Sequence, residues 1–430
     1  MRFLTGGIFN FFTRVLLAGL NLVTGILLAR MLSLEDRGLY SLVALVMSIL
    51  FLAGNFGLST STVYYAAKKE TNRGKLLANS FIASLVLPLA LGVLFFLAAP
   101  LFSKFLSGMS DKYLLLSLSA LPFYFFYIMF TGLLLGTNRI KEYNFVRMFE
   151  SVALLVFVFI ALYLIGAGLR GAVLGWWLSV FFAGLLSVIL VFSKVKFKLK
   201  FYPVEFKKTL KYGFKSYFAN LSQFFNYRLD MFLVSLFTGW AGVGVYAVAV
   251  SLGEILWFLP NSVASLLLPK TSATSVKERN NFTPVVSRIS FTITVLISIL
   301  LFAFSGPLVK LLFGAKFIPS IVPLLILIPG TLIFSLQTIL ASDIAGRGKP
   351  EYNTYISFGG LLITIVLDLV LIPAYGVSGA AWASTVSYIA STAATIVIFL
   401  KMSGSSISSI IFIKRRDIEL FRKRLAGFKK

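Results

Sequence analysis

The stretch GLYSL at residues 38–42 returns 206 residues later as GVYAV at residues 244–248. In the same register Asn55 aligns with Asn261. The chain is therefore built as a tandem of two similar halves. Tandem halves made of apolar segments are typical of secondary transporters, whose working site lies near the bilayer midplane where the halves meet.

A second pair of similar stretches supports the tandem. GLRGA at residues 168–172 is followed 208 residues later by GVSGA at residues 376–380. The offset is nearly the same as in the first pair, so the repeat extends through most of each half.

The composition indicates a membrane protein. Hydrophobic residues make up 58% of the chain and charged residues 13%, with a mean hydropathy of +0.93, whereas soluble domains carry about 25% charged residues. Apolar runs recur along nearly the whole length, and each is long enough to cross a hydrocarbon core of about 30 Å. The first run, residues 6–32, is too long for the apolar core of a cleavable signal peptide, so we expect it to be the first span.

Two residue types are missing, and their absence narrows the chemistry. The chain has no Cys and no His, which removes thiolate chemistry, the commonest metal ligand and the usual proton shuttle. No phosphate-binding loop, nucleophile motif or metal motif occurs either. We therefore expect no metal site and no enzymatic activity.

The net charge of +25 follows from membrane topology. With the N-terminus inside, the predicted cytoplasmic segments hold 30 of the 40 Lys and Arg residues and the external segments hold six. This asymmetry is the positive-inside rule, and it predicts an even number of spans with both termini in the cytoplasm. Nucleic-acid binding, another common reason for a strongly basic chain, is not expected.

We predict an all-α polytopic membrane protein with twelve transmembrane helices. The longest polar interruption, residues 194–209, alternates Lys with apolar residues, which suits a basic linker lying on anionic headgroups of the cytoplasmic leaflet. It separates an N-lobe, residues 1–193, from a C-lobe, residues 210–400. Residues 401–430 form a basic amphipathic cytoplasmic tail. The predicted spans are roughly 7–31, 38–66, 76–103, 113–136, 143–166, 171–193, 210–237, 243–269, 285–312, 320–345, 354–373 and 378–400.

A polar stripe marks one side of the first span. At about 100° per residue, Asn10, Arg14 and Asn21 fall within about 40° of one another. A charge at the bilayer centre costs about 2.5 kcal/mol or more, so it normally faces a cavity or a partner. The alternative is that Arg14 extends to the cytoplasmic headgroups.

The seventh span, the repeat counterpart of the first, has a polar stripe of its own, which includes Asn220, Gln223 and Asp230. Cationic side chains in and near such stripes could hold a phosphate-type anion through charge-assisted hydrogen bonds. The cationic candidates are Arg14, Arg228, Lys215 and Arg30, and the polar candidates for the cavity lining are Asn10, Asn21, Asn55, Asn220, Gln223 and Asn261.

Three carboxylates lie inside predicted spans and are candidates for ion coupling. Asp230, Glu254 and Asp368 could each carry a proton or Na⁺ that links transport to a gradient. Structural ion pairs between the two lobes remain the alternative for every buried charge.

Three groups of motifs carry a family pattern. The first is LARML (28–32), GLY (38–40) and GLST (57–60); the second is RLD (228–230), GVYAVA (244–249) and LP (268–269); the third is DLVLIP (368–373) and YGVSGAA (375–381). Together they resemble the polysaccharide-biosynthesis flippases of the multidrug/oligosaccharidyl-lipid/polysaccharide transporter superfamily. The resemblance covers essentially the whole chain.

This resemblance implies an architecture and a mechanism. Two six-helix lobes would form a V around a central cavity. Alternating access would move an undecaprenyl-diphosphate-linked oligosaccharide from the cytoplasmic to the outer leaflet. The diphosphate would be received by Arg14, with Arg228 as a second candidate. Gly38 and Gly244 would allow close helix approach and bending during the transition.

The expected function is therefore that of a plasma-membrane flippase for surface polysaccharide assembly, and not that of an enzyme. Its partners would be the lipid-linked glycan, anionic lipids of the cytoplasmic leaflet and other assembly proteins such as a glycan polymerase. The sequence requires no cofactor apart from a coupling H⁺ or Na⁺. Three alternatives remain: an ion-coupled multidrug or toxin extruder, a lipid II flippase, and a non-transporting membrane subunit of a glycan-assembly complex.

Overall fold

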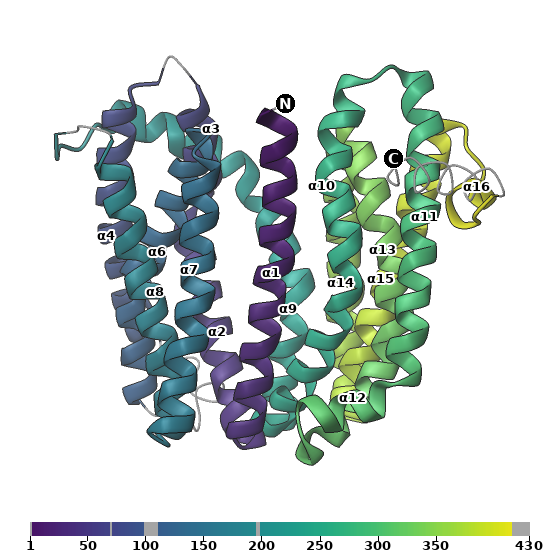
Figure 1. The fold of residues 1–430 in the computed structure, drawn as a ribbon, viewed down its shortest axis with the longest axis horizontal. Helices are drawn as coiled ribbons and strands as arrows, with labels where there is room; N and C mark the ends of the chain where they lie inside the picture. Colours follow the sequence, from purple (N-terminus) through teal and green to yellow (C-terminus); the bar gives the residue numbers. More distant parts are fainter. Residues whose placement is uncertain (1, 69–70, 99–110, 195–197, 415–430) are drawn as a thin grey trace, which may run out of the picture. The chain divides into compact units, whose positions relative to one another are not determined.

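Every regular element of the described residues is a helix in the computed structural model (Figure 1). The structure describes residues 2–68, 71–98, 111–194 and 198–414. Side chains within those ranges are described except at 2–12, 14, 111, 215–216, 218–220, 222–223, 226–228, 269 and 273.

The predicted all-α membrane architecture is confirmed. Ten helices of the described residues are long and apolar enough to cross a membrane, and the apolar helix Val15–Met31 is shorter. They follow one another in the order of the predicted spans. By its contacts the chain forms two compact units: residues 1–224 with 238–244 form unit 1, and residues 225–237 with 245–430 form unit 2. The predicted domains, 1–193, 194–209, 210–400 and 401–430, stay a prediction; the contacts group residues 194–224 with unit 1.

Unit 1 is a bundle in which α6 and α8 pack against each other and against their neighbours. The helix α8 also packs on α7, α6 on α3 and α4, and α1 on α7. The helices are α1 (Arg2–Met31), α2 (Leu34–Asn55), α3 (Leu58–Ala67), α4 (Arg73–Ala98), α6 (Asp111–Gly136), α7 (Ile140–Phe159) with its π-helical extension η2 (Ile160–Leu164), α8 (Gly168–Phe192) and the first part of α9 (Pro203–Gly253).

Unit 2 is organised around α13 and α15, which pack along each other. The helix α14 packs on α15, while α10 and α11 pack on α13. The helices after α9 are η3 (Glu254–Trp257), α10 (Phe258–Ala273), α11 (Val276–Ala303), α12 (Ser305–Leu312), η4 (Ala315–Ser320), α13 (Ile321–Gly346), α14 (Glu351–Tyr375), α15 (Val377–Ser403) and α16 (Ile407–Ile411).

Local sequence signals explain where several helices begin. The Ser33 hydroxyl accepts a hydrogen bond from the Asp36 backbone N–H at 3.0 Å and caps α2. At the start of α11, Ser275 and Glu278 form a reciprocal capping box. Such caps satisfy backbone N–H groups that have no partner within the helix.

Two predicted spans are interrupted. The second, predicted as 38–66, is broken between α2 and α3, because Phe56 and Gly57 both adopt positive φ angles (45° and 73°). The eighth, predicted as 243–269, contains the 3-10 turn Glu254–Trp257. The seventh and eighth spans are joined by a kink at Gly239, whose φ of 71° is open to glycine but strained for other residues.

The two copies of the repeat meet within unit 1 through equivalent glycines. A Cβ on Gly38 would lie 2.7 Å from the Trp240 carbonyl carbon and nearer still to its oxygen; a Cβ on Gly244 would press on the carbonyl oxygen of Leu34. Leu34 and Trp240 are themselves separated by the repeat offset of 206, so the contact has approximate two-fold symmetry. The predicted close helix approach at Gly38 and Gly244 is confirmed.

The segment that follows α8 is fixed to α4 in unit 1. The Asn79 amide donates to the Tyr202 carbonyl at 2.9 Å and accepts from the Tyr202 N–H at 2.8 Å. Lys75 forms an ion pair with Glu205 at 2.6 Å. These bonds explain why residues 198–205 group with unit 1 rather than forming a separate linker.

A buried ion pair joins helices at one end of unit 2. The Asp343 carboxylate is fully buried, pairs with Arg347 and accepts from the Thr283 hydroxyl at 2.9 Å. Arg347 also donates to the Asn280 side chain at 2.8 Å and to the Met402 carbonyl at 3.3 Å. The pair therefore ties α13 to α11 and to the end of α15.

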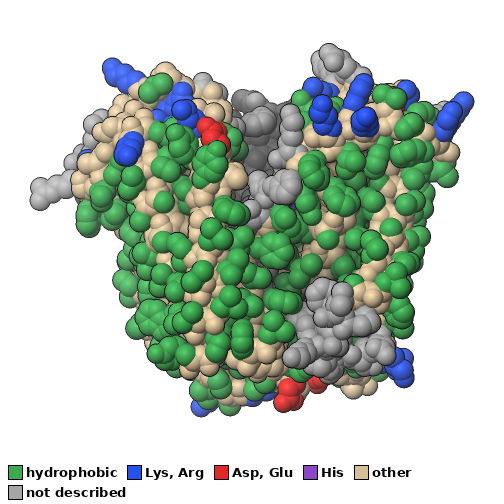
Figure 2. All heavy atoms as spheres, turned by 180° about the vertical axis from the view of Figure 1, so that it is seen from behind, with side chains coloured by type: hydrophobic (Ala, Val, Ile, Leu, Met, Phe, Trp, Pro, Cys, Tyr) green, Lys and Arg blue, Asp and Glu red, His purple; other side chains and the backbone are tan. Residues whose placement is uncertain are grey.

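The sides of the bundles are covered by exposed apolar side chains. Helix α4 alone exposes Leu89, Val93, Leu94 and Leu97 by 61% or more. Figure 2 shows hydrophobic side chains over the long sides of the helices, with Lys and Arg gathered mainly at one end of each bundle. Such large exposed apolar surfaces are expected against lipid and are unusual in soluble monomers.

The predicted amphipathic tail lies largely outside the described residues, which end at 414. Its first part is seen as α16, whose Ile410 is fully buried. Arg288 of α11 donates to the Ser409 carbonyl at 3.0 Å. This part of the tail is therefore packed on unit 2.

Candidate functional site

Most of the predicted cationic site lies outside the described side chains. Arg30 is described: it is exposed in the last turn of α1. The predicted grouping of cationic and polar residues in one cavity stays a prediction. The candidates whose side chains are not described are Asn10, Arg14, Lys215, Asn220, Gln223 and Arg228.

The two repeat-related asparagines have different surroundings. Asn55 is buried, and its amide bonds Ser59 twice: it donates to the hydroxyl at 2.9 Å and accepts from the backbone N–H at 3.0 Å. It thereby bridges the helix break at Phe56. Asn261 lies in the unbroken helix α10 and is exposed, as is Asn21 on α1. Asn55 therefore supports the backbone, and Asn21 and Asn261 remain candidates for a cavity lining.

The structure brings two of the three predicted coupling carboxylates together, in unit 2. Asp230 of α9 and Asp368 of α14 are both buried, with 4% and 0% exposure, and are close enough to interact electrostatically. Glu254, the third candidate, is the half-buried first residue of η3.

Asp230 is held by hydrogen bonds. Its carboxylate accepts from the Tyr246 hydroxyl at 2.6 Å and from the Ser384 hydroxyl at 3.3 Å. The backbone N–H of Met231 donates to its other oxygen at 2.7 Å. Three donors thus hold this buried carboxylate in place.

Asp368 is in the opposite situation. Within the described part of the chain, neither of its carboxylate oxygens has a hydrogen-bond partner, although both are buried. Burying an unpartnered charge is costly, and a like charge on Asp230 adds repulsion. The pair therefore offers a place where a proton or a monovalent cation would relieve an unbalanced negative charge.

Two helix hairpins explain how these residues meet. Asp230 and Tyr246 stand on either side of the kink at Gly239, and Asp368 and Ser384 stand on either side of the turn at Gly376. Residues at similar distances before and after a hairpin turn lie side by side on antiparallel helices. At 1.5 Å per residue the site lies about 10–14 Å along the helices from these turns.

Sequence reasoning missed Tyr246 and Ser384 as members of this site. A signal existed for Tyr246, because the repeat sets it opposite Tyr40. A hydroxyl repeated within apolar helices is a reason to look for a polar partner. Ser384 carries no such signal, since it is one of many serines that bond within apolar helices here.

The fold defines the class as a polytopic helical membrane protein, and the comparisons with known proteins agree. The chain matches the family described as "Polysaccharide biosynthesis protein" over residues 3–275. This is more than half of its length, and the protein belongs to this family.

Curated relatives are archaeal membrane proteins. The chain is 27% identical to an uncharacterized membrane protein of Methanocaldococcus jannaschii over 60% of this chain and 64% of the relative. It is 25% identical to the "Probable low-salt glycan biosynthesis flippase Agl15" of Haloferax volcanii over 46% of this chain and 43% of the relative. The matched region thus spans less than two thirds of either protein.

Solved structures share the fold. An inward-facing multidrug resistance MATE family transporter of the MOP superfamily matches with a TM-score of 0.74 and 18% identity, covering 91% of this chain and 97% of that one. The lipid II flippase MurJ, in an inward closed conformation, matches with a TM-score of 0.73 and 18% identity, covering 99% and 96%. The fold is therefore shared with both drug transporters and a lipid flippase.

Proposed function

We propose that this protein flips a lipid-diphosphate-linked oligosaccharide across the membrane for surface polysaccharide assembly. The membership of its family, over residues 3–275, is the observation that carries the substrate class. The name of the Haloferax relative, a glycan biosynthesis flippase, supports it. The substrate would enter from the cytoplasmic leaflet, with both termini of the chain on that side.

In this proposal the cationic residues of spans one and seven receive the diphosphate. Arg14 is the first candidate, followed by Arg228, with Lys215 and Arg30 at the margins. An Arg guanidinium offers several donors in a geometry that suits phosphate oxygens, and it stays charged in an apolar setting.

The carboxylate pair of unit 2 supplies the coupling. A proton or Na⁺ would bind between Asp230 and Asp368, because Asp368 is buried without a partner among the described residues. Binding would stabilise those conformations of unit 2 that have the higher affinity for the ion. A difference in ion affinity between two conformations is what shifts their populations.

The flippase function is tested with the purified chain in proteoliposomes. The probe is a fluorescent polyprenyl-diphosphate oligosaccharide whose outer-leaflet fraction is read with a membrane-impermeant quencher. We expect Arg14→Ala to slow flipping at least tenfold and Arg14→Lys to retain most of it. Wild-type flipping by Arg14→Ala would contradict the assigned role of Arg14, and no flipping by the wild-type chain would contradict the function.

Coupling is tested in the same vesicles with an imposed Na⁺ or pH gradient. Asp368→Asn keeps the side-chain volume and removes the charge, so flipping should lose its response to the gradient. Glu351→Gln, an exposed carboxylate in the first turn of the same helix, is the matched control. An unchanged response in Asp368→Asn would exclude this residue from coupling.

A drug extruder is the second candidate, because a MATE family transporter shares the fold. That function would show as export of a cationic dye from the same vesicles while the glycan lipid stays in place. The two outcomes separate the candidates, since a flippase for an anionic head should leave the dye where it is.

A further inference from the structure

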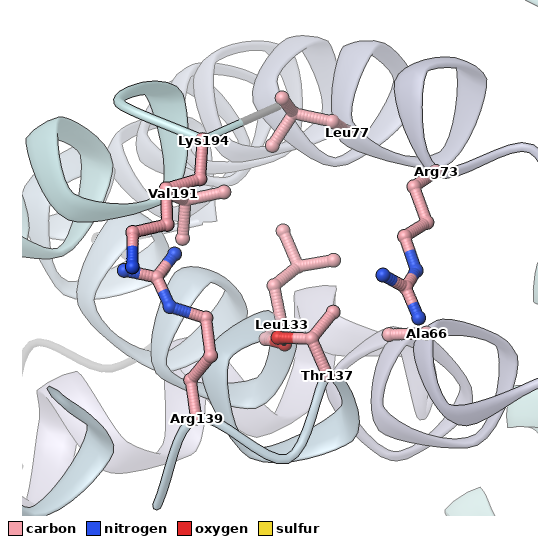
Figure 3. A pocket seen from close by; sticks show the side chains of 8 residues that line it. All are labelled: Ala66, Arg73, Leu77, Leu133, Thr137, Arg139, Val191 and Lys194. Carbon is pink, nitrogen blue, oxygen red and sulfur yellow. The ribbon is translucent and has the colours of Figure 1, made fainter. Parts of the chain in front are cut away.

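A cavity opens at the end of unit 1 where α3, α6 and α8 end and α4 begins. Its volume is about 170 Å³, well above the 10–15 Å³ or so that one water molecule requires. Figure 3 shows its lining side chains. They are Ala66, Arg73, Leu77, Leu133, Thr137, Arg139, Val191 and Lys194.

Three cationic side chains border this cavity from three separate segments. In Figure 3, Arg73 lies on one side, and Arg139 and Lys194 lie together on the opposite side. Arg139 donates to the Glu142 carboxylate at 3.0 Å and to the Leu190 carbonyl at 2.9 Å, and Lys194 lies 4.0 Å from the same carboxylate. Two of the three cations thus share the Glu142 carboxylate, and no contact between Arg73 and this carboxylate is found among the described residues.

Arg73 contributes the charge that is most available. It is exposed at the first position of α4, and none of the described residues forms a hydrogen bond or ion pair with its side chain. The nearby positive charge of Lys75 is already used by Glu205. An excess of positive charge therefore remains on the Arg73 side of the cavity.

The remaining walls are apolar. Ala66, Leu77, Leu133 and Val191 are each less than 5% exposed and belong to the core of the bundle. The hydroxyl of Thr137 bonds back to the Leu133 carbonyl at 2.7 Å and leaves the cations as the main polar groups of the lining. Cations above an apolar wall suit an anion that carries an apolar extension.

The frame around the cavity is closely packed. The close contact between Gly136 and α3 leaves no room for a Cβ, which would lie 2.7 Å from the Ala66 side chain. The bonds from Asn79 hold Tyr202 against α4. The apolar walls and the Arg139 side chain, which its bonds to Glu142 and Leu190 hold in place, thus form the space before any ligand binds, and this lowers the entropic cost of binding.

We propose that this cavity binds a phosphate-type anion, whose source is the headgroup of an anionic phospholipid in the adjacent leaflet or free phosphate. Its lining contains none of the residues proposed above for substrate or ion binding. It does not rest on the transported substrate. Guanidinium and ammonium groups together provide the charge-assisted hydrogen bonds that phosphate oxygens accept.

The experiment uses the full chain in a neutral detergent and native mass spectrometry, with titrations of short-chain phosphatidylglycerol, short-chain phosphatidylcholine and inorganic phosphate. The variants are Arg73→Gln, Lys194→Gln and the double variant. Both residues are exposed, so neither change removes packing. Lys207→Gln, an exposed cation near the start of α9, is the control.

We expect phosphatidylglycerol to bind the wild-type chain and the Lys207→Gln control equally, and the double variant at least tenfold more weakly. Phosphatidylcholine should bind more weakly than phosphatidylglycerol. If inorganic phosphate binds with the same dependence on the two residues and phosphatidylglycerol does not, the source is free phosphate and the site still holds. If neither anion binds, or if the double variant binds as the wild type does, the proposal is wrong.

Discussion

The close helix contact at Gly38 predicts that a larger residue there lowers the stability of unit 1, and the distances in the structure indicate by how much. In Gly38→Ala the new methyl group would lie 2.7 Å from the Trp240 carbonyl carbon and 3.2 Å from the Gly244 nitrogen. These are backbone atoms, so no side chain can rotate away, and the two helices must separate. We therefore expect Gly38→Ala to destabilise unit 1.

The magnitude combines two opposing effects. Overpacking a tight contact costs about 1–3 kcal/mol, and a backbone clash belongs at the upper end. Ala is about 1 kcal/mol better than Gly within a helix, which offsets part of this cost. The net loss is about 2 kcal/mol, which for a unit of this size lowers the melting temperature by roughly 4–8 °C.

The assay is thermal unfolding of the purified chain in detergent, followed by tryptophan fluorescence. Gly92→Ala in α4 is the matched control, because a Cβ there meets nothing within 4 Å. It should leave the melting temperature unchanged or slightly higher. Gly244→Ala should reproduce the loss, and the double variant should lose less than the sum because both glycines form one contact. A Gly38→Ala protein that melts as the control does would refute the close contact.

Three further predictions concern carboxylates. Asp343→Ala leaves the Arg347 guanidinium buried without its ion partner and should cost about 3–5 kcal/mol, visible as a large fall in melting temperature and yield. The Lys75 hydrogen bond lowers the pKa of Glu205, so the pair stabilises the fold above the carboxyl's unfolded pKa and loses this effect as pH falls through the lower folded value. The melting difference between wild type and Glu205→Gln should therefore be full at pH 7, begin to shrink as pH falls below the unfolded pKa of about 4.3, and vanish once pH is below the lower folded pKa. Asp368→Asn should raise the melting temperature in ion-free buffer, since it removes a buried charge that has no described partner; a fall would show that the charge is structurally satisfied.

Much of the fold could be predicted from the sequence, because apolar length and charge asymmetry act on whole segments. The interruptions could not. The chain has 33 glycines, and nothing in the local sequence distinguishes Gly57, which adopts a positive φ between two helices, from Gly92, which lies within one. Phe56, with a φ of 45°, contradicts the usual preference of a bulky residue. Tertiary contacts decide these positions.

The candidate sites, like the fold, could be predicted from the sequence only in part. Asp230 and Asp368 could be predicted because an ionisable residue in an apolar helix is conspicuous. Their meeting could not, because it depends on two hairpins whose turns place them at a similar depth. The cavity cations were harder still: Arg73, Arg139 and Lys194 contribute to the topological charge excess in the sequence, and only the packing of three separate segments makes them one cluster.

Equivalent positions in the two copies of the repeat have different surroundings. In unit 1, Thr24 occupies the position of Asp230 and bonds its own helix at the Leu20 carbonyl. Tyr40 occupies the position of Tyr246 and has the Arg37 guanidinium 5.7 Å from its ring centre.

One repeated tyrosine thus stands beside a cation, and the other donates to a carboxylate. Symmetry is kept where the two copies touch through Gly38 and Gly244, since a Cβ at either position would meet backbone. It is lost where charge is introduced, and at the described positions the carboxylate pair exists in one copy only. A proton or cation that binds this pair would therefore bind to unit 2 alone. One ion could then shift the conformational equilibrium of one of two similar halves and not of the other.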